Sequence, residues 1–153
     1  MTTRSTTSIP QSPPRPPPVL VVDDDVSGAR ATLLSLDDGG YATTTESDGD
    51  AVLRLVRREA MRLVVSELYI ACSEGACVVQ ALKADRVRLP RLRVLAHSRH
   101  TAPADDAWAL AAGCDAVLHK PAATRSLLRE VRRLDGGERT DAGDLADDGV
   151  QGD

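Results

Sequence analysis

The sequence predicts an α/β fold, a doubly wound, five-stranded parallel sheet with helices on both faces. Short apolar runs of strand length alternate strictly with segments whose apolar residues recur at helical spacing. The chain has 153 residues, which is the length of one domain with room for a buried core. Strands that are each separated by a helix form a parallel sheet, and such sheets are covered on both faces.

The first half of the chain alternates strand, helix, strand and helix. The run VLVV at 19–22 is apolar throughout, as expected of a strand that is buried on both faces. Residues 26–36 carry leucines and alanines at helical spacing, and 41–45 is a Thr-rich strand that follows a Gly-Gly break. Residues 51–56 continue the pattern as a helix, with nearby arginines on its solvent-facing side.

The middle of the chain contains two more strands and the helix between them. The run LVV at 63–65 is short and apolar, and its two valines are β-branched residues that favour a strand. Residues 75–84 place valines and a leucine at helical spacing. The run LRVLA at 92–96 is the next predicted strand.

The last third of the predicted domain adds a helix, a strand and a final helix. Segment 103–112 begins with proline, which suits the first turn of a helix, and Gly113 is expected to end it. The run AVLH at 116–119 is the fifth strand. Residues 124–134 form the last helix, with Thr124 as the expected N-cap.

The two ends of the chain differ from its body in composition. Residues 1–18 are rich in Ser, Thr and Pro and are expected to form a disordered leader, and 135–153 a disordered acidic tail. The leader carries a net charge of +2, the body at 19–134 is neutral and the tail carries −6, which together give −4. A neutral body lacks the basic patch of nucleic-acid-binding and membrane-surface proteins, so we expect neither partner.

The cysteines and the N-terminal residues indicate a cytoplasmic protein. Three cysteines without regular spacing, and without a C-x-x-C pair, do not form a disulfide framework. The N-terminal residues lack the apolar segment of a secretory signal, and no apolar run is long enough to span a bilayer. We therefore expect the thiols to be reduced.

Charged and polar side chains follow several predicted strands at their carboxyl ends. In a parallel sheet these ends meet at one edge, and ligands bind beyond it where the strand order reverses. Clustered carboxylates repel unless a cation neutralises them, and their oxygens suit Mg²⁺. A hydroxyl and an ammonium beside them suit an anion such as a phosphoryl group. The residues expected at this edge are Asp23, Asp24, Asp25, Glu67, His97, Ser98, His119 and Lys120.

Residues 19–134 resemble the receiver domain of bacterial two-component response regulators. The resemblance rests on the segments VLVVDDD, GYATTTESDGDAV, RLVVSELYIACSEGA, RVLAHS and AAGCDAVLHKP, which follow the family's order and spacing over about three quarters of the chain. No single motif is specific, but the ordered set is. The resemblance implies a flavodoxin-like fold of five strand–helix units and a role in phosphorelay signal transduction rather than catalysis.

The resemblance also implies a Mg²⁺ site. In the family two acids after the first strand bind the metal, and Asp23 and Asp24 stand at these positions. The carboxylate at the acceptor position, here Glu67, lies at the same site, and a backbone carbonyl two residues later, here that of Tyr69, completes the protein ligands.

The phosphoryl-contacting residues that the resemblance implies are Ser98 and Lys120. In the family an Asp at the end of the third strand accepts the phosphoryl group from a histidine kinase, whereas this chain has Glu67. Two further positions depart from the family's pattern. Val117 stands at the switch position, where an aromatic residue is usual, and Ala122 where a Phe is frequent.

Glutamate at the acceptor position is expected to impair phosphorylation. Its side chain reaches about 1.5 Å further than aspartate, and a misplacement near 1 Å can cost roughly a hundredfold in rate. We expect phosphorylation at Glu67 to be slow or absent. The carboxylate would instead pair with Lys120 and supply one permanent negative charge in place of the nearly two of a phosphoryl group.

Other interpretations stay open from the sequence alone. The chain could be a receiver that does accept a phosphoryl group on Glu67. Glu67 could also point to solvent and pair with Arg99 at little energetic value. The motif VLVVDDDVS further fits the phosphatases of the haloacid dehalogenase type, with Asp23 as nucleophile and Asp25 as acid/base.

Protein contacts are the expected route of output. The tail after residue 134 is too short and too acidic for a DNA-binding or catalytic output domain. In single-domain receivers the surface of the fourth helix, fifth strand and fifth helix often serves, which here means residues 104–134. The expected partner is a histidine kinase or another signalling protein, and a homodimer is left open.

Overall fold

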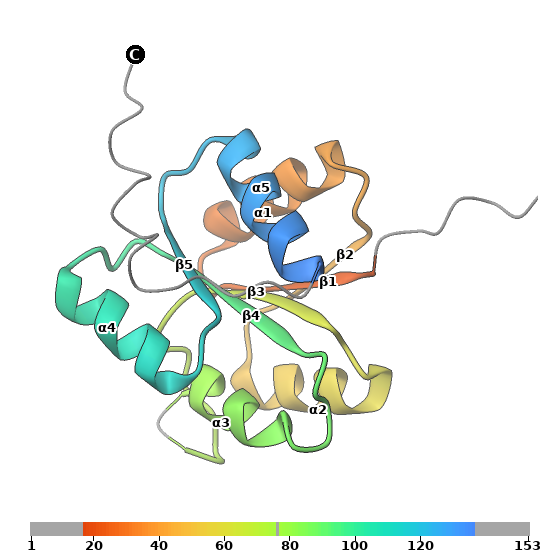
Figure 1. Cartoon of the computed structure of the whole chain (residues 1–153), viewed down its shortest axis with the longest axis vertical. Coiled ribbons are helices and arrows are strands. Elements are labelled where there is room, and N and C mark those ends of the chain that lie inside the picture. Colours follow the sequence, from red (N-terminus) through yellow and green to blue (C-terminus); the bar gives the residue numbers. More distant parts are fainter. Residues whose placement is uncertain (1–16, 76, 137–153) are drawn as a thin grey trace, which may run out of the picture.

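The computed structural model describes residues 17–75 and 77–136 (Figure 1). Nearly all of the expected leader and tail lies outside these residues. The strands are β1 (Val19–Val22), β2 (Thr43–Glu46), β3 (Leu63–Ser66), β4 (Arg93–Ser98) and β5 (Ala116–His119). The helices are α1 (Val26–Asp38), α2 (Gly49–Glu59), α3 (Val78–Asp85), α4 (Pro103–Ala112) and α5 (Thr124–Asp135). The predicted alternation of strands and helices is therefore confirmed.

The strands form one parallel sheet in the order β2-β1-β3-β4-β5. The chain moves from β1 to one side for β2 and to the other side for β3, so the strand order reverses at β1. Helices α1 and α5 cover one face, and α2, α3 and α4 cover the other (Figure 1). This is the doubly wound, flavodoxin-like arrangement that the sequence predicts.

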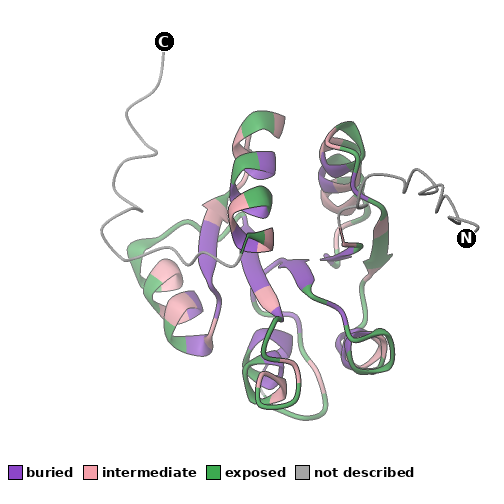
Figure 2. Ribbon diagram, turned by 45° about the vertical axis from the view of Figure 1, so that its right-hand side comes forward, coloured by how far each residue is buried: buried purple, intermediate pink, exposed green. Residues whose placement is uncertain are grey.

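Each face of the sheet has its own core, because alternate residues of a strand point to opposite faces. Figure 2 shows most of the strands buried between helices whose outer sides are exposed, whereas the edge strand β2 is exposed or half-buried. The strand residues on the α1 and α5 side are Val19, Val21, Leu63, Val65, Leu95, Ala116 and Leu118. Those on the opposite side are Leu20, Val22, Val64, Val94, Ala96 and Val117. The continuous apolar runs are thus explained by burial on both faces.

Several element ends differ from the sequence prediction. Helix α2 begins two residues early, because the Asp48 carboxylate caps it by accepting a hydrogen bond from Ala51 N at 3.1 Å. Strand β4 runs to Ser98, since it pairs with the whole length of β5. Helix α3 begins only at Val78.

Thr124 is not the N-cap of α5, which corrects the sequence prediction. Ala123 occupies the N-cap position and makes no side-chain cap, and Thr124 is the first helical residue. Its hydroxyl lies 2.9 Å from the hydroxyl of Ser35 on α1. The side chain therefore joins the two helices on this face instead of satisfying a backbone N–H of its own helix.

A buried ion pair joins the starts of β4 and β5 to the end of α3. Asp115, just before β5, lies 2.5 Å from the Arg86 guanidinium, and its side chain is only 1% exposed. The same carboxylate oxygen accepts a hydrogen bond from Val94 N at 2.8 Å. Removing one partner of such a pair leaves the other charge buried without compensation.

We predict that Asp115→Ala lowers the free energy of unfolding by about 3 kcal/mol, because Arg86 and the Val94 N–H lose this acceptor. Urea denaturation at pH 7 measures the change. The exposed Asp38→Ala serves as control and should stay within about 0.5 kcal/mol. A loss below about 1 kcal/mol for Asp115→Ala would contradict the prediction.

Candidate functional site

Two buried carboxylates lie side by side at the carboxyl edge of the sheet. Asp23 follows β1 and Glu67 follows β3, and the pairing of Val22 with Ser66 brings them to the same level. Glu67 N donates to the carbonyl of Val22 at 2.8 Å, which fixes the backbone at this point. The exposed fraction of Asp23 is 4% and that of Glu67 is 3%. A pair of carboxylates so placed requires a cation nearby.

Lys120 supplies that cation from the end of β5. Its Nζ lies 2.5 Å from Asp23 Oδ2 and 3.2 Å from Glu67 Oε2. The backbone N–H of Lys120 donates to the carbonyl of Ser98 at 2.8 Å, which continues the pairing of β5 with β4. The structure therefore contains the contact between Glu67 and Lys120 that the extra length of glutamate suggested.

The Glu67 carboxylate is held in its charged form. Burial by itself raises the pKa of this carboxyl, but hydrogen bonds from Ser98 and Leu68 and the Lys120 ammonium together bring the pKa below its ordinary value. The Leu68 N–H donates to Glu67 Oε1 at 2.9 Å. Ser98 is itself fully buried and accepts a hydrogen bond from His100 N at 2.9 Å.

Arg99 brings a second cation to the same edge. Its guanidinium lies 3.5 Å from Asp24, 3.9 Å from Asp25 and 3.9 Å from Glu67. Its backbone N–H also donates to Glu67 Oε2 at 3.4 Å. The alternatives of a Lys120 contact and an Arg99 contact for Glu67 are thus both realised. Solvent exposure of Glu67 is wrong, because the end of β3 directs its side chain inward.

The three successive acids at 23–25 have three different surroundings. Asp23 is buried, and its Oδ1, the oxygen that does not contact Lys120, accepts a hydrogen bond from Asp25 N at 2.9 Å. Asp25 is the N-cap of α1 and accepts from Gly28 N at 3.1 Å. Asp24 has a side chain that is 63% exposed. Side chains that follow a strand without a regular element point in different directions, so the motif does not form one compact carboxylate cluster.

The expected Mg²⁺ ligands have suitable oxygens but do not converge on one point. Asp23 and Glu67 both lie against the Lys120 ammonium, and Asp24 lies with Arg99. Among residues 17–75 and 77–136, no three His, Cys, Asp or Glu side chains are grouped to hold a metal ion. Tyr69, whose carbonyl is the fourth expected ligand, has a left-handed backbone with φ 62°. In this arrangement Lys120 and Arg99 occupy the acidic edge, so a metal ion would compete with both side chains for the carboxylate oxygens.

The Tyr69 side chain takes part in an aromatic cluster that the sequence analysis did not find. Its ring lies 4.8 Å from the Trp108 ring and 5.0 Å from the His100 ring, between centroids. Its hydroxyl lies 2.5 Å from Asp105 on α4, and this hydrogen bond is the main reason that its pKa is raised to about 12. Only the spacing of aromatic residues around the rim could have indicated this contact between the β3–α3 loop and α4.

The expected switch position is filled by a buried aliphatic side chain. Val117 on β5 is 7% exposed and belongs to the core under α2, α3 and α4. The next polar residue on this strand, His119, instead lies 2.7 Å from Asp106 on α4. At the surface, β5 is therefore joined to α4 by the contact between the His119 imidazole and the Asp106 carboxylate.

Residues 19–132 match the sequence profile of the response regulator receiver domain. The chain belongs to the response regulator receiver family. The match includes residues 23–25, so the acidic motif lies within the receiver-domain match. No curated protein sequence matches the chain significantly.

Solved structures agree with this assignment. The receiver resembles the chemotaxis response regulator CheY4 of Vibrio cholerae with a TM-score of 0.66 and 24% identity, over 77% of this chain and 98% of that one. It also resembles NtrX from Brucella abortus, solved with ADP, with a TM-score of 0.67 and 26% identity, over 79% of this chain and 26% of that one. The receiver domain of the Francisella response regulator 1452 has a TM-score of 0.65 and 25% identity, over 79% of this chain and 98% of that one.

Family membership defines the general role of the receiver. Receiver domains act in two-component signalling, interact with kinases and effector domains, and typically bind Mg²⁺ at the acceptor site. Within the part of the chain that the structure describes, no helix combines the length and apolar character needed to cross a membrane.

We predict that Glu67→Gln lowers the free energy of unfolding at pH 7 by about 2 kcal/mol, because charged hydrogen bonds to the carboxylate are lost. The pKa of Glu67 is lowered in the folded state from 4.5. Its stabilising effect is therefore complete above that pH and is lost as the pH falls through the folded-state pKa. Urea denaturation between pH 7 and pH 3 should show the two proteins converging.

The exposed Glu59→Gln is the matched control for this measurement, because the Glu59 side chain lies at the surface and pairs with the adjacent, exposed Arg58. It should change stability by less than about 0.5 kcal/mol at every pH. A difference between wild type and Glu67→Gln that stays constant from pH 7 to pH 3 would show that the Glu67 charge does not stabilise the fold.

Proposed function

We propose that this chain is an atypical receiver whose phosphoryl switch is impaired, and that it signals through protein contacts in one predominant state. The contact of Glu67 with Lys120 at 3.2 Å carries the proposal. Glu67 stands at the acceptor position, directly after β3, and Ser98 and Lys120 stand where they would contact a phosphoryl group. The buried carboxylate already lies among these partners.

The geometry of phosphoryl transfer explains why glutamate impairs the switch. This reaction depends on placing the acceptor oxygen in line and on stabilising charge, so a small displacement has a large effect. Glu67 Oε1 accepts from Leu68 N and Glu67 Oε2 contacts Lys120, so each oxygen is already engaged. An incoming phosphoryl group would have to displace one of these contacts and find room beside Arg99.

The charge of Glu67 supports a single state. A phosphoryl group adds a charge near −2, whereas Glu67 supplies −1 at all pH values above its pKa. Lys120 therefore contacts Glu67 even when no phosphoryl group is present. With Val117 at the switch position, no aromatic side chain is available there to change its orientation when the site changes.

Mg²⁺ would be held by Asp23, Asp24, Glu67 and the Tyr69 carbonyl, where it would neutralise carboxylates and an incoming phosphoryl group. We propose that it binds weakly here. Lys120 and Arg99 already compensate these acids, and the ion would have to compete with both side chains. Arg99 follows β4 directly, and its position in sequence fixes it at the edge.

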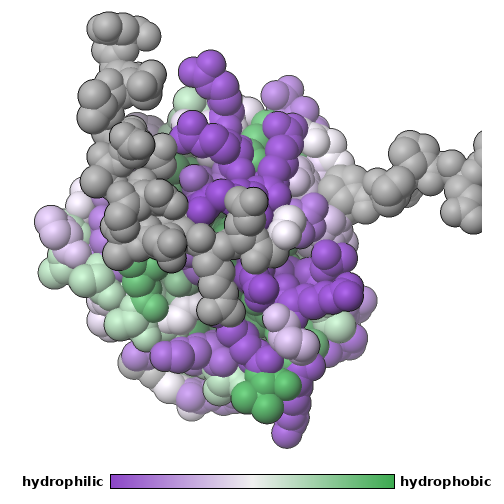
Figure 3. Space-filling view, in the orientation of Figure 1, coloured by the Kyte–Doolittle hydropathy of each residue, from purple (hydrophilic) through white to green (hydrophobic). Residues whose placement is uncertain are grey.

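The surface of α4, β5 and α5 is the proposed contact surface for a partner. Figure 3 shows apolar residues gathered over α4, whereas α1 and α5 are largely hydrophilic. Tyr69, which is 42% exposed, borders this surface and packs against Trp108 of α4. Aromatic residues at such a place contribute strongly to interfaces. The partner would be a histidine kinase or another signalling protein in the cytoplasm, or a second copy of the chain.

We predict that wild-type protein gains no phosphoryl group from acetyl phosphate and Mg²⁺, whereas Glu67→Asp gains one. Aspartate withdraws the carboxylate by about 1.5 Å and reopens space among Ser98, Lys120 and the metal ligands. Intact mass measured after incubation detects the added group directly, and Glu67→Gln under the same conditions gives the background.

Phosphorylation of wild type on Glu67 would overturn the proposal and make the chain an ordinary switch with an unusual acceptor. Failure of both wild type and Glu67→Asp would show that Glu67 is not the sole obstacle. In that case Arg99 and the other departures around the site would have disabled it, and the proposal of a single-residue block would be wrong.

We predict that Arg99→Ala strengthens Mg²⁺ binding roughly fivefold, near 1 kcal/mol, because a competing cation that is partly exposed is removed. Isothermal titration calorimetry of the full chain measures the affinity. Arg91→Ala is the matched control, since Arg91 precedes β4 while Arg99 follows it, roughly 20 Å away. Equal effects of the two substitutions would show that only net charge matters.

A further inference from the structure

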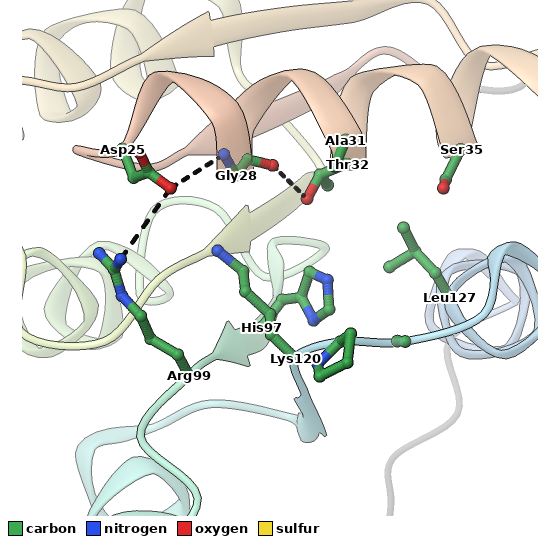
Figure 4. A pocket seen from close by; sticks show the side chains of 11 residues that line it. Asp25, Gly28, Ala31, Thr32, Ser35, His97, Arg99, Lys120 and Leu127 are labelled. Atoms are coloured by element: carbon green, nitrogen blue, oxygen red, sulfur yellow. Dashed lines mark hydrogen bonds and ion pairs between the residues drawn. The ribbon is translucent and has the colours of Figure 1, made fainter.

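A pocket of about 350 Å³ lies beside the acidic edge, between α1, the end of β4 and the loop from β5 to α5 (Figure 4). Its walls include Ala31, Thr32, His97, Lys120, Ala122 and Leu127. It is separate from the hollow that contains Asp23 and Asp24 on the β2 side of α1. Small-molecule sites in proteins measure about 300–1,000 Å³, so the pocket has the size for a compact ligand.

Small side chains on two walls create the space. Gly28, Ala31, Thr32 and Ser35 follow at helical spacing along one side of α1. Ala122, in the loop after β5, lines the pocket where a larger side chain would fill it. Figure 4 shows Leu127 closing the end near Ser35, with Lys120 and Arg99 at the opposite end. The walls are therefore mainly apolar.

His97 gives this pocket one directed polar atom. It is 6% exposed, and its Nδ1 lies 3.0 Å from the carbonyl of Leu118. Burial lowers the pKa of His97, so the ring is neutral at neutral pH. A carbonyl only accepts hydrogen bonds, so Nδ1 carries the proton and Nε2 presents a lone pair.

The lone pair of His97 faces unfilled space. Nε2 has no hydrogen-bond partner among the residues that the structure describes, although the ring lines the pocket. Figure 4 shows the ring below α1, between Lys120 and Leu127. Since His97 lines the pocket, a ligand there that donates a hydrogen bond would find Nε2 as an acceptor.

The charged groups at the mouth of the pocket already have partners within the protein. Lys120 contacts Asp23 and Glu67, and Asp25 lies 3.9 Å from Arg99. A charged ligand would lose its hydration without gaining a free counter-ion. The surroundings therefore favour an uncharged molecule.

We propose that this pocket binds a small, uncharged ring compound with one N–H or O–H group, of the indole or phenol type, which donates a hydrogen bond to His97 Nε2. Burial of the ring against Ala31, Ala122 and Leu127 supplies affinity, and His97 sets the orientation. This ligand site is distinct from the acceptor position, and its ligand is not a phosphoryl group. Since Lys120 lines this pocket and also holds Glu67, the bound ring lies against the side chain that neutralises the acidic edge.

The experiment is an NMR titration of the isotope-labelled full chain with indole and with 1-methylindole. The two probes have the same ring system, but only indole can donate a hydrogen bond. We expect saturable shifts of the amide signals of Thr32, His97 and Leu127, and binding of indole about tenfold tighter than that of 1-methylindole. Equal affinity for the two probes, or no saturable shifts, would overturn the proposal.

Ala122→Phe and Ala123→Phe form the matched pair of variants. Both add the same side chain at neighbouring positions, but only Ala122 lines the pocket, and Ala123 is exposed. Ala122→Phe should abolish the indole shifts, whereas Ala123→Phe should retain them. Retention in both variants would show that indole binds elsewhere. The comparison of the two probes on wild type needs no variant, and it is independent of whether Glu67 accepts a phosphoryl group.

Discussion

The ammonium of Lys120, shared by Asp23 and Glu67, is the interaction on which the carboxyl edge of the receiver depends. The two acids follow adjacent strands, and both are almost completely buried. Without a cation their repulsion would force one of them to take up a proton. Lys120 follows β5, which is separated from β3 by β4, and only a long side chain carries its charge back to both carboxylates. Three strand ends are thereby held together by one group.

Arg99 extends this compensation to the outer part of the edge. It lies near Asp24, Asp25 and Glu67, and its side chain is 55% exposed. An exposed guanidinium contributes little to the free energy of unfolding. Because it lies beside the acidic side chains, however, it competes with a cation that would bind to them. In the proposed function, Glu67 and Arg99 therefore act together. The Glu67 carboxylate occupies the position of the phosphoryl group, and the positive charge of Arg99 disfavours a bound metal ion.

The contacts between the site and α4 also differ from an aromatic switch. Val117 is packed in the core, where its rotation would require the neighbouring side chains to move. The Tyr69 ring instead reaches α4 from the β3–α3 loop, next to Trp108, and its hydroxyl meets Asp105. An aromatic surface of this kind is formed without any change at Glu67, which suits a domain recognised by its partner in one state.

The sequence by itself determined the elements, their order and the identity of the residues at the edge. Apolar runs such as 19–22 and 63–65 specify buried strands locally, and the alternation with helices specifies a parallel sheet whose ends coincide. The tertiary structure decided where the side chains point. The Thr124 hydroxyl contacts Ser35 instead of capping its own helix, and the Glu67 side chain is buried. The reason is that these directions depend on distant partners: Lys120 and Asp23 are 97 residues apart, and the pocket beside His97 exists only where α1 meets the β5–α5 loop.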